Sequence, residues 1–237
     1  MSEFEYVKKN YEALLSEIRG YEKLYNRRIT VVAVTKSGSD EELLALVKAG
    51  ASDLAENRPG ELKRRAELLR DAGYEPRFHE IGNLQRNKVK LIVNEASLIH
   101  SVGRYELAKE ISDQALKLGI TVPVLIEINS AKEDLKGGVA PENAEDLFLK
   151  VRALPAVSVK GLMTMGPAFD NAEDLRPYFR LTKEIFDRIN TEHGFDGDGI
   201  LSMGMSNSYA VAIEEGSTLI RVGRKLFEKM KGDRENV

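Results

Sequence analysis

The chain has no cysteine, no surplus of basic residues and no long apolar run, and each absence excludes a class of function. Without cysteine there is no disulfide, thiolate metal site or cysteine nucleophile. A formal net charge of −3 offers no basic surface to a nucleic acid. No apolar stretch reaches the roughly 18 residues that cross a membrane, and the charged first segment does not resemble an export signal. We therefore expect a cytoplasmic protein with no nucleic-acid or membrane partner.

The sequence does contain a regular alternation of short apolar runs and amphipathic segments. Its 237 residues, 42% of them apolar, suffice for one large α/β domain. In residues 104–118 the apolar side chains recur with the 3.6-residue period of a helix. Strands are predicted at Ile29–Val34, Ser52–Ala55, Phe78–Ile81, Leu98–Val102, Val122–Ile128, Val157–Met163, Gly199–Met203 and Thr218–Val222. Helices are predicted at Glu41–Ala49, Glu61–Ala72, Arg104–Leu118, Asn143–Ala153 and Ala172–His193.

Strands separated by helices predict a parallel sheet with right-handed crossovers. Eight such units in about 200 residues favour a closed α/β barrel, the (β/α)8 TIM barrel. We expect a single domain over residues 1–237, with an extra N-terminal helix at 1–27, the barrel at 28–228 and a tail at 229–237. An open doubly wound sheet is the alternative, but no GxGxxG motif follows the first strand.

Residues that typically begin or end helices occur at the expected places. Gly50, Gly73, Gly119 and Gly194 stand where helices should end. Asp40 stands where an N-cap belongs, just before the first barrel helix.

Polar residues cluster at the carboxyl ends of the predicted strands, where barrel enzymes build their sites. We therefore expect one polar rim on an otherwise apolar barrel. Its candidate members are Lys36, Glu56, Asn57, His79, Ser101, Glu127, Asn129, Thr164, Ser202, Ser206, Arg221 and Gly223.

Lys36 is the strongest candidate for chemistry because it follows a buried strand. A lysine amine attacks a carbonyl only in its uncharged form, and removal from water at a barrel mouth favours that form. The product would be an imine with an aldehyde cofactor or a carbonyl substrate. The alternative is a surface lysine that pairs with Glu56 or Glu127 across the rim.

A phosphate site is predicted from residues 201–223. Ser206 precedes an apolar helical segment, and Gly223 ends the last predicted strand. The loops after strands seven and eight form the usual phosphate site of such barrels, and glycine allows a close backbone approach. The alternative is that Ser206 only caps a helix. Together with Lys36, this site indicates a phosphorylated aldehyde, of which pyridoxal 5′-phosphate is the common one.

Arg221 and His79 complete the candidate site. Arg221 would lie beside the pyridine ring and leave its nitrogen N1 a hydrogen-bond acceptor, although an ordinary salt bridge is the alternative. His79 could hydrogen-bond the cofactor or have a structural role. The spacing of the three histidines predicts no metal site. Four methionines, Met163, Met165, Met203 and Met205, are expected to line the barrel.

Seven segments together resemble the pyridoxal phosphate homeostasis protein family, which is similar to the barrel domain of alanine racemase. They are AVTKSGS, AENRPGE, FHEIGNLQRNKVK, IHSVGR, GLMTMGP, LSMGMSNSYAVAI and GSTLIRVGRKLF, in order over residues 31–227. Three residues depart from the pattern: Ala55 replaces a usual glycine, Asn207 a common aspartate, and Glu228 follows Phe227 in place of glycine.

The resemblance implies a role for each matched residue. Lys36 would hold pyridoxal 5′-phosphate as a Schiff base, with Asn57 and His79 bordering the cofactor. The phosphate would bind Ser206 and the backbone of Gly223, and Arg221 would face N1.

Two functions remain open: a carrier that stores, buffers or delivers the cofactor in vitamin B6 homeostasis, and an amino-acid racemase or related enzyme. Racemisation needs two bases on opposite faces of Cα, and Lys36 supplies only one. The barrel occupies the chain to about Phe227, which leaves little for a second domain, so we expect a carrier and a monomer. Apoenzymes are the expected recipients. A Schiff-base aldolase is disfavoured by the first-strand position of Lys36.

Overall fold

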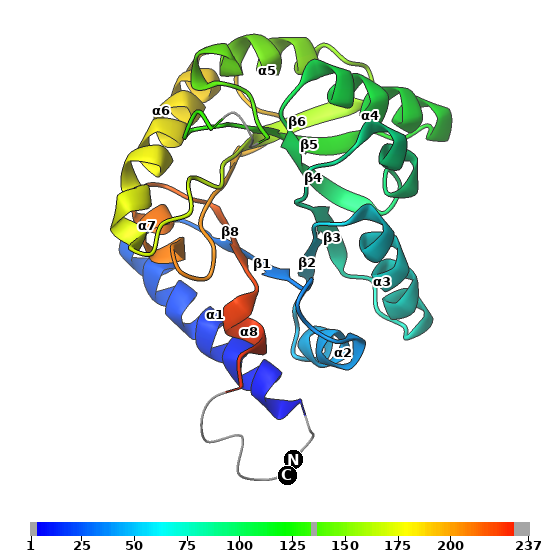
Figure 1. Cartoon of the computed structure of the whole chain (residues 1–237), viewed down its shortest axis with the longest axis vertical. Coiled ribbons are helices and arrows are strands. Elements are labelled where there is room, and N and C mark those ends of the chain that lie inside the picture. Colours follow the sequence, from blue (N-terminus) through cyan, green and yellow to red (C-terminus); the bar gives the residue numbers. More distant parts are fainter. Residues whose placement is uncertain (1–3, 134–136, 230–237) are drawn as a thin grey trace.

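A closed barrel of eight parallel strands, paired in chain order from β1 to β8, forms the centre of the protein (Figure 1). The computed structural model describes residues 4–133 and 137–229. The barrel closes where β1 pairs with β8, as in the register Val31 to Ile220. The strands are β1 (Thr30–Val34), β2 (Asp53–Glu56), β3 (Arg77–Glu80), β4 (Ala96–Val102), β5 (Val122–Glu127), β6 (Val157–Met163), β7 (Ile200–Ser202) and β8 (Leu219–Val222).

The single-domain α/β barrel predicted from the alternation is thus confirmed, and each predicted strand end lies within two residues of the observed one. Helices surround the barrel on its outside (Figure 1). The α-helices are α1 (Glu5–Tyr25), α2 (Asp40–Lys48), α3 (Pro59–Asp71), α4 (Tyr105–Leu118), α5 (Ala144–Arg152), α6 (Arg176–Glu192), α7 (Tyr209–Glu214) and α8 (Arg224–Phe227). The described residues also form the 3-10 helices η1 (Arg86–Leu91), η2 (Pro141–Asn143) and η3 (Ala172–Leu175).

The extra N-terminal helix is α1, which packs against α2 and α8 with a buried face that includes Tyr11, Leu14 and Ile18. Helix α1 therefore connects the helix that follows the first strand with the helix that follows the last strand. Most of the predicted tail, residues 230–237, and the first three residues of the predicted helix lie outside the described residues.

Two boundary predictions need correction. The N-cap of α2 is Ser39, not Asp40: its hydroxyl accepts the amide N–H of Glu42, and the Glu42 carboxylate accepts the N–H of Ser39. The single helix predicted from Ala172 is divided between Leu175 and Arg176 into η3 and α6, and Pro177 lies in the first turn of α6, where a helix tolerates proline. The glycines expected to end helices at 50, 73, 119 and 194 all have positive φ, as predicted.

The apolar core has two parts. A small cluster inside the barrel contains Val32, Val34, Leu98 and Leu125. A much larger one lies between the strands and the helices, as in α/β barrels generally. Of the four methionines, Met163 and Met203 are buried, but Met165 and Met205 are 40% and 39% exposed, so these two do not line the barrel.

Within the described ranges, no helix has both the length and the apolar character that a membrane span needs.

Candidate functional site

Lys36 lies in the turn that follows β1, at the carboxyl end of the barrel. Its side chain is exposed, so the predicted removal from water is not present in this structure. Within the described residues, no hydrogen bond or ion pair joins Lys36 to Glu56 or Glu127, which removes the alternative of a pairing across the rim.

The backbone of this turn is held by Arg65, a residue of α3 that is only 6% exposed. Its Nη1 donates to the carbonyl of Thr35 and its Nη2 to the carbonyl of Gly38, each at 2.6 Å. Nη1 also lies 2.6 Å from a carboxylate oxygen of Glu56. One buried guanidinium therefore fixes the carbonyls on both sides of Lys36 while the lysine side chain stays free.

Glu56 was expected on the polar rim, and the structure corrects this. Side chains alternate along β2, so that Asp53 and Ala55 face the barrel interior while Leu54 and Glu56 face the helices. Glu56 belongs to the layer that anchors Arg65 and does not face the site.

Ser206 and Gly223 meet at the same end of the barrel as Lys36. The amide N–H of Gly223 donates to Oγ of Ser206 at 3.2 Å. A Cβ at position 223 would lie 2.9 Å from the carbonyl oxygen of Val34, two residues before Lys36. Glycine is therefore required at 223 by the close approach of the ends of β8 and β1. Barrel closure brings residues nearly 190 positions apart to one rim.

The segment after β7 differs slightly from its prediction. Helix α7 begins at Tyr209, and the hydroxyl of Ser208 accepts the N–H of Met205 at 3.1 Å. Ser206 thus lies in the turn before the helix. Helix α8 begins directly after Gly223, as predicted.

Arg221 is buried, with 3% of its surface exposed, and it points into the barrel interior. Its Nη1 donates to Oγ of Ser202 at 2.5 Å and its Nη2 to the carbonyl of Thr164 at 3.0 Å. Burial lowers the pKa of Arg221 to about 10, and the carboxylate of Glu127 opposes this shift. Burial likewise raises the pKa of Glu127, against the charge of Arg221. Arg221 therefore remains a cation and a pure hydrogen-bond donor at neutral pH.

A chain of hydrogen bonds runs from Arg221 through the barrel interior to Asp53. Ser202 Oγ lies 3.0 Å from Nδ1 of His100, whose Nε2 lies 2.9 Å from Nδ1 of His79. Nε2 of His79 is 3.2 Å from the carboxylate of Asp53. We call these five residues the buried chain.

The two ends of the buried chain determine the proton positions within it. Arginine can only donate and a carboxylate can only accept. Every bond is satisfied with neutral imidazoles if Ser202 donates to His100, His100 donates through Nε2 to His79, and His79 donates through Nε2 to Asp53. Burial, with the charge of Arg221, holds the pKa of His100 well below its usual value, which agrees with a neutral ring.

His79 thus has partners on both ring nitrogens, and it connects to Arg221 only through His100 and Ser202. Its predicted contact with a cofactor stays a prediction. Asn57 is half-buried at the rim, and its carbonyl oxygen lies so close to Gly82 that a Cβ there would be 2.1 Å away. The loops after β2 and β3 are therefore in tight backbone contact.

Sequence reasoning missed Arg65 and the buried chain as a connected unit. The position of Arg65 gave a signal, because it shares the buried face of α3 with Leu62, Ala66 and Leu69. A charged residue on an apolar face needs a buried partner. His100 gave a weaker signal, as a polar residue within an apolar strand.

One group of metal-ligand type occurs among the described residues: Glu145, Glu192 and His193, with ligand atoms within 4.8 Å of one another. It lies on the outside, at α5 and the end of α6. His193 bonds Glu145 at 2.9 Å and Arg188 lies 3.5 Å from the same carboxylate. Because Arg188 already supplies positive charge, we interpret this group as a surface ion pair.

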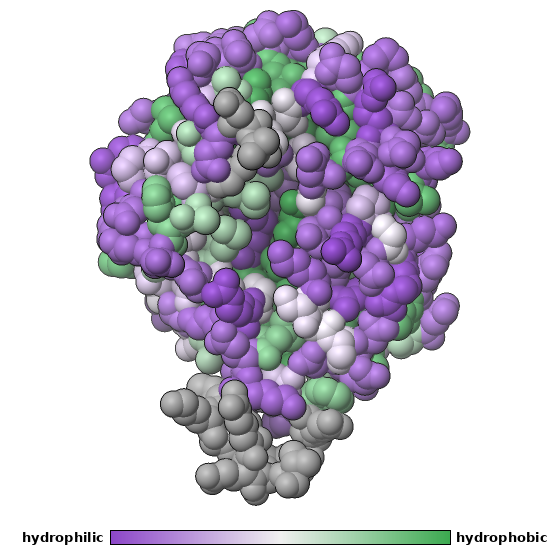
Figure 2. Space-filling view, viewed as in Figure 1, coloured by the Kyte–Doolittle hydropathy of each residue, from purple (hydrophilic) through white to green (hydrophobic). Residues whose placement is uncertain are grey.

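The surface in the view of Figure 2 is mostly hydrophilic, with hydrophobic residues both near the middle of the barrel and at its periphery.

Comparisons with known proteins show the family and the fold of this chain. Residues 10–229 match the family described as alanine racemase, N-terminal domain. A relative from Aquifex aeolicus, named pyridoxal phosphate homeostasis protein, is 42% identical over 85% of this chain and 87% of its own. The crystal structure of an unknown protein from Bifidobacterium adolescentis has a TM-score of 0.88 at 32% identity, over 95% of this chain and 96% of that one. PipY of Synechococcus elongatus, solved with pyridoxal phosphate (PLP) bound, has a TM-score of 0.81 at 25% identity, over 94% of this chain and 100% of its own.

Proposed function

This chain belongs to the pyridoxal phosphate homeostasis protein family, and on that premise we propose that it binds pyridoxal 5′-phosphate and acts in vitamin B6 homeostasis. It would store, buffer or deliver the cofactor. The name of the Aquifex relative and the PLP bound to PipY support this function.

The observation that carries the proposal is the meeting of Ser206 and Gly223 beside the end of β1. A backbone N–H and a hydroxyl are donors suited to phosphate oxygens. Here the Gly223 N–H donates to Oγ of Ser206, so both groups lie within reach of one ligand, and a phosphate oxygen would replace that bond. Gly223 leaves no side chain in the way of a close approach. The donor set therefore fits a phosphate group, and Lys36 lies on the same rim.

Lys36 is the residue to which the cofactor would be attached. Bound PLP supplies an aldehyde that an uncharged lysine amine can attack. The exposed side chain of Lys36 can reach solvent, while Arg65 keeps its backbone in place. This combination favours reversible loading, because an exposed amine is accessible to both incoming cofactor and a recipient.

Arg221 would face the pyridine nitrogen N1, and Asn57 would border the ring at the rim. A carboxylate at N1 would keep that nitrogen protonated and make the ring a strong electron acceptor, whereas an arginine cannot. The arginine in this position supports holding of the cofactor more than carbanion chemistry on an amino acid. His79 would influence the cofactor indirectly, through the hydrogen bonds that connect it to Arg221 in the buried chain.

Covalent attachment is tested by incubation of the full chain with PLP, borohydride reduction and peptide mass spectrometry. We expect one modified peptide, with the label on Lys36, and a visible absorbance band that Lys36→Ala abolishes. The matched control is Lys48→Ala, which removes an exposed lysine from the far end of the helix that follows Lys36. A chain that never retains PLP, or a label that persists in Lys36→Ala, would contradict the proposal.

The same preparation separates a carrier from an enzyme. The rate at which solvent deuterium enters Cα of alanine is measured with the loaded chain and with free PLP. For a carrier we expect no acceleration over free PLP. Sustained turnover that disappears in Lys36→Ala would instead identify the chain as a racemase or a related enzyme.

A further inference from the structure

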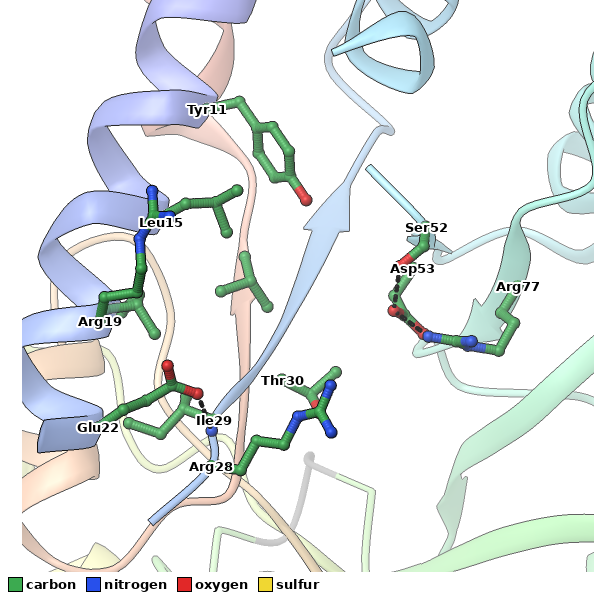
Figure 3. Close-up of a pocket in the computed structure, with 12 residues that line it drawn as sticks. Tyr11, Leu15, Arg19, Glu22, Arg28, Ile29, Thr30, Ser52, Asp53 and Arg77 are labelled. Atoms are coloured by element: carbon green, nitrogen blue, oxygen red, sulfur yellow. Dashed lines mark hydrogen bonds and ion pairs between the residues drawn. The ribbon is translucent and has the colours of Figure 1, made fainter. Parts of the chain in front are cut away.

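A second cavity lies at the amino-terminal ends of the strands, between α1 and the first residues of β1, β2 and β3 (Figure 3). Its volume is about 570 Å³, which is large enough for a small organic molecule. We call it the amino-terminal cavity. The candidate cofactor site is at the opposite ends of the same barrel, because Lys36 follows β1 and Gly223 follows β8.

Guanidinium groups dominate the polar part of its wall, which includes Arg19, Arg28 and Arg77. Within residues 4–133 and 137–229, Arg19 and Arg28 have no hydrogen bond or ion pair. Figure 3 shows Arg28 extending from the start of β1 toward the space between α1 and Arg77. A guanidinium offers several N–H donors in a planar fork that matches a carboxylate or a phosphate. Two such groups without partners complement an anion.

The two carboxylates of the wall are already engaged by the protein. Glu22 accepts the amide N–H of Ile29 at 2.8 Å. Asp53 accepts two hydrogen bonds from Arg77, at 2.7 and 2.6 Å. Both carboxylates of the wall thus already have partners, and so does Arg77, whereas Arg19 and Arg28 have none among the described residues. With three arginines and two carboxylates, the lining carries one net positive charge.

Apart from two small hydroxyl residues, the rest of the wall is mainly apolar. Leu15 and Ile18 of α1 lie on one side, with Ile29 at the start of β1. Tyr11 adds an aromatic ring whose hydroxyl points toward the open space in Figure 3. Burial, together with the charge of Asp53, raises the pKa of Tyr11, so this hydroxyl stays a donor at neutral pH. A ligand here would pack an apolar body against α1 and direct its charge to the arginines.

We propose that the amino-terminal cavity binds a small organic anion with an aromatic or other apolar body, whose phosphate or carboxylate is held by Arg28, with Arg19 adding positive charge from α1. The size of the cavity, the two arginines without partners, the carboxylates that already have partners and the apolar wall all favour this class over a cation or a purely polar ligand. The site is separate from the cofactor site and does not depend on the function proposed for it.

Isothermal titration calorimetry with phenyl phosphate tests the proposal on the full chain, and benzoate distinguishes a carboxylate ligand. We expect saturable binding of at least one of the two, and none of benzyl alcohol, which has the ring without the charge. Arg28→Gln should weaken binding about tenfold, as expected for the loss of a charged hydrogen bond, and Arg19→Gln should weaken it less, through the loss of one positive charge. Both residues are exposed, so both variants should fold normally.

The matched control is Arg104→Gln, which removes the same charge from an exposed position at the start of α4, at the other end of the barrel. It should leave the affinity unchanged, and so should Ser206→Ala. Failure of both anions to bind, or binding that neither Arg19→Gln nor Arg28→Gln weakens, would overturn the proposal. Binding that Ser206→Ala abolishes would place the ligand in the cofactor site and overturn it equally.

Discussion

Glu80 combines complete burial with a second carboxylate nearby, and this environment makes its protonation part of the stability of the fold. The side chain is 0% exposed at the end of β3, where it accepts the N–H of Gly82 at 2.8 Å. Burial raises its pKa from the usual 4.5 to about 7; the hydrogen bond from Gly82 opposes this shift, and the charge of Glu56 adds to it. The protonated form is therefore favoured in the folded state.

The sign of the pH dependence follows from this shift. A raised pKa contributes stability that is fully present below pH 4.5 and is lost as the pH rises through 7. Glu80→Gln mimics the protonated acid and does not titrate. From pH 5 to pH 8 the free energy of unfolding of this variant should therefore rise by about 2 kcal/mol relative to that of the parent chain, which is less than the free energy that corresponds to the whole pKa shift. Urea denaturation at both pH values measures this difference.

Glu75→Gln, an exposed change on the segment before β3, is the control and should leave the pH dependence as it is in the parent chain. If the advantage of Glu80→Gln were the same at pH 5 and pH 8, Glu80 would not be the group responsible.

For single residues, the sequence predicted those that follow the strands and missed those whose hydrogen bonds hold the strand ends in place. Lys36, Ser206 and Gly223 could be placed because each follows an apolar strand, and parallel strands bring their ends together. The contact between Arg65 and the Lys36 turn depends on how α3 packs over β1 and β2. No local pattern encodes that packing, so only the structure reveals it.

Among the elements, α2 starts at the Lys36 turn, and its N-terminus is fixed by side chains. Ser39 and Glu42 form a reciprocal pair of hydrogen bonds across the first turn. Asp40 binds Arg64 of α3 at 2.7 Å, which ties the two helices together. The residue that sequence analysis placed at the cap therefore serves as a link between neighbouring helices.

We expect Ser39→Ala to lower the free energy of unfolding by about 1 kcal/mol, because it leaves the N–H of Glu42 without its partner. Ser37→Ala, an exposed serine of the same turn, is the matched control and should change stability much less. Chemical denaturation of both variants measures the difference. Equal losses in the two variants would show that the capping hydrogen bonds do not stabilise α2.

Element boundaries were predictable where a residue changes the backbone directly. The positive φ of Gly119 ends α4, and α6 begins at Arg176 with Pro177 in its first turn. The division before α6 was nevertheless missed, because the apolar period of residues 172–193 continues through it. Hydrophobic periodicity reports which face is buried and is insensitive to a change of helix type.

For the whole molecule, closure of the barrel has two consequences that the chain order conceals. It places Gly223 against Val34, so the last strand completes the turn that carries Lys36. It also surrounds a polar interior, in which the buried chain connects Arg221 to Asp53. Asp53 lines the amino-terminal cavity as well, so one residue belongs to both the cavity wall and the chain that ends at Arg221.

The proton order of the buried chain is a property of the complete barrel, since its members come from β2, β3, β4, β7 and β8. An added proton on His79 would reverse the donor and acceptor in two hydrogen bonds, the one between His79 and His100 and the one between His100 and Ser202. Oγ of Ser202 would then accept from both His100 and Arg221, and its hydrogen would lose its acceptor.

We therefore predict that the two buried imidazoles are neutral and carry their protons on Nε2. Long-range nitrogen–proton NMR spectra of the full chain test this, because the chain has only three histidines and His193→Gln removes the signal of the third. The depressed pKa of His100 means that its contribution to stability is present above pH 6.5 and is lost as the pH falls below it, opposite in direction to that of Glu80. At least one buried ring should keep its Nε2–H signal unchanged from pH 8 to pH 5. If both rings acquired a second proton within that range, or if either carried its proton on Nδ1, the order of bonds from Arg221 to Asp53 would be wrong.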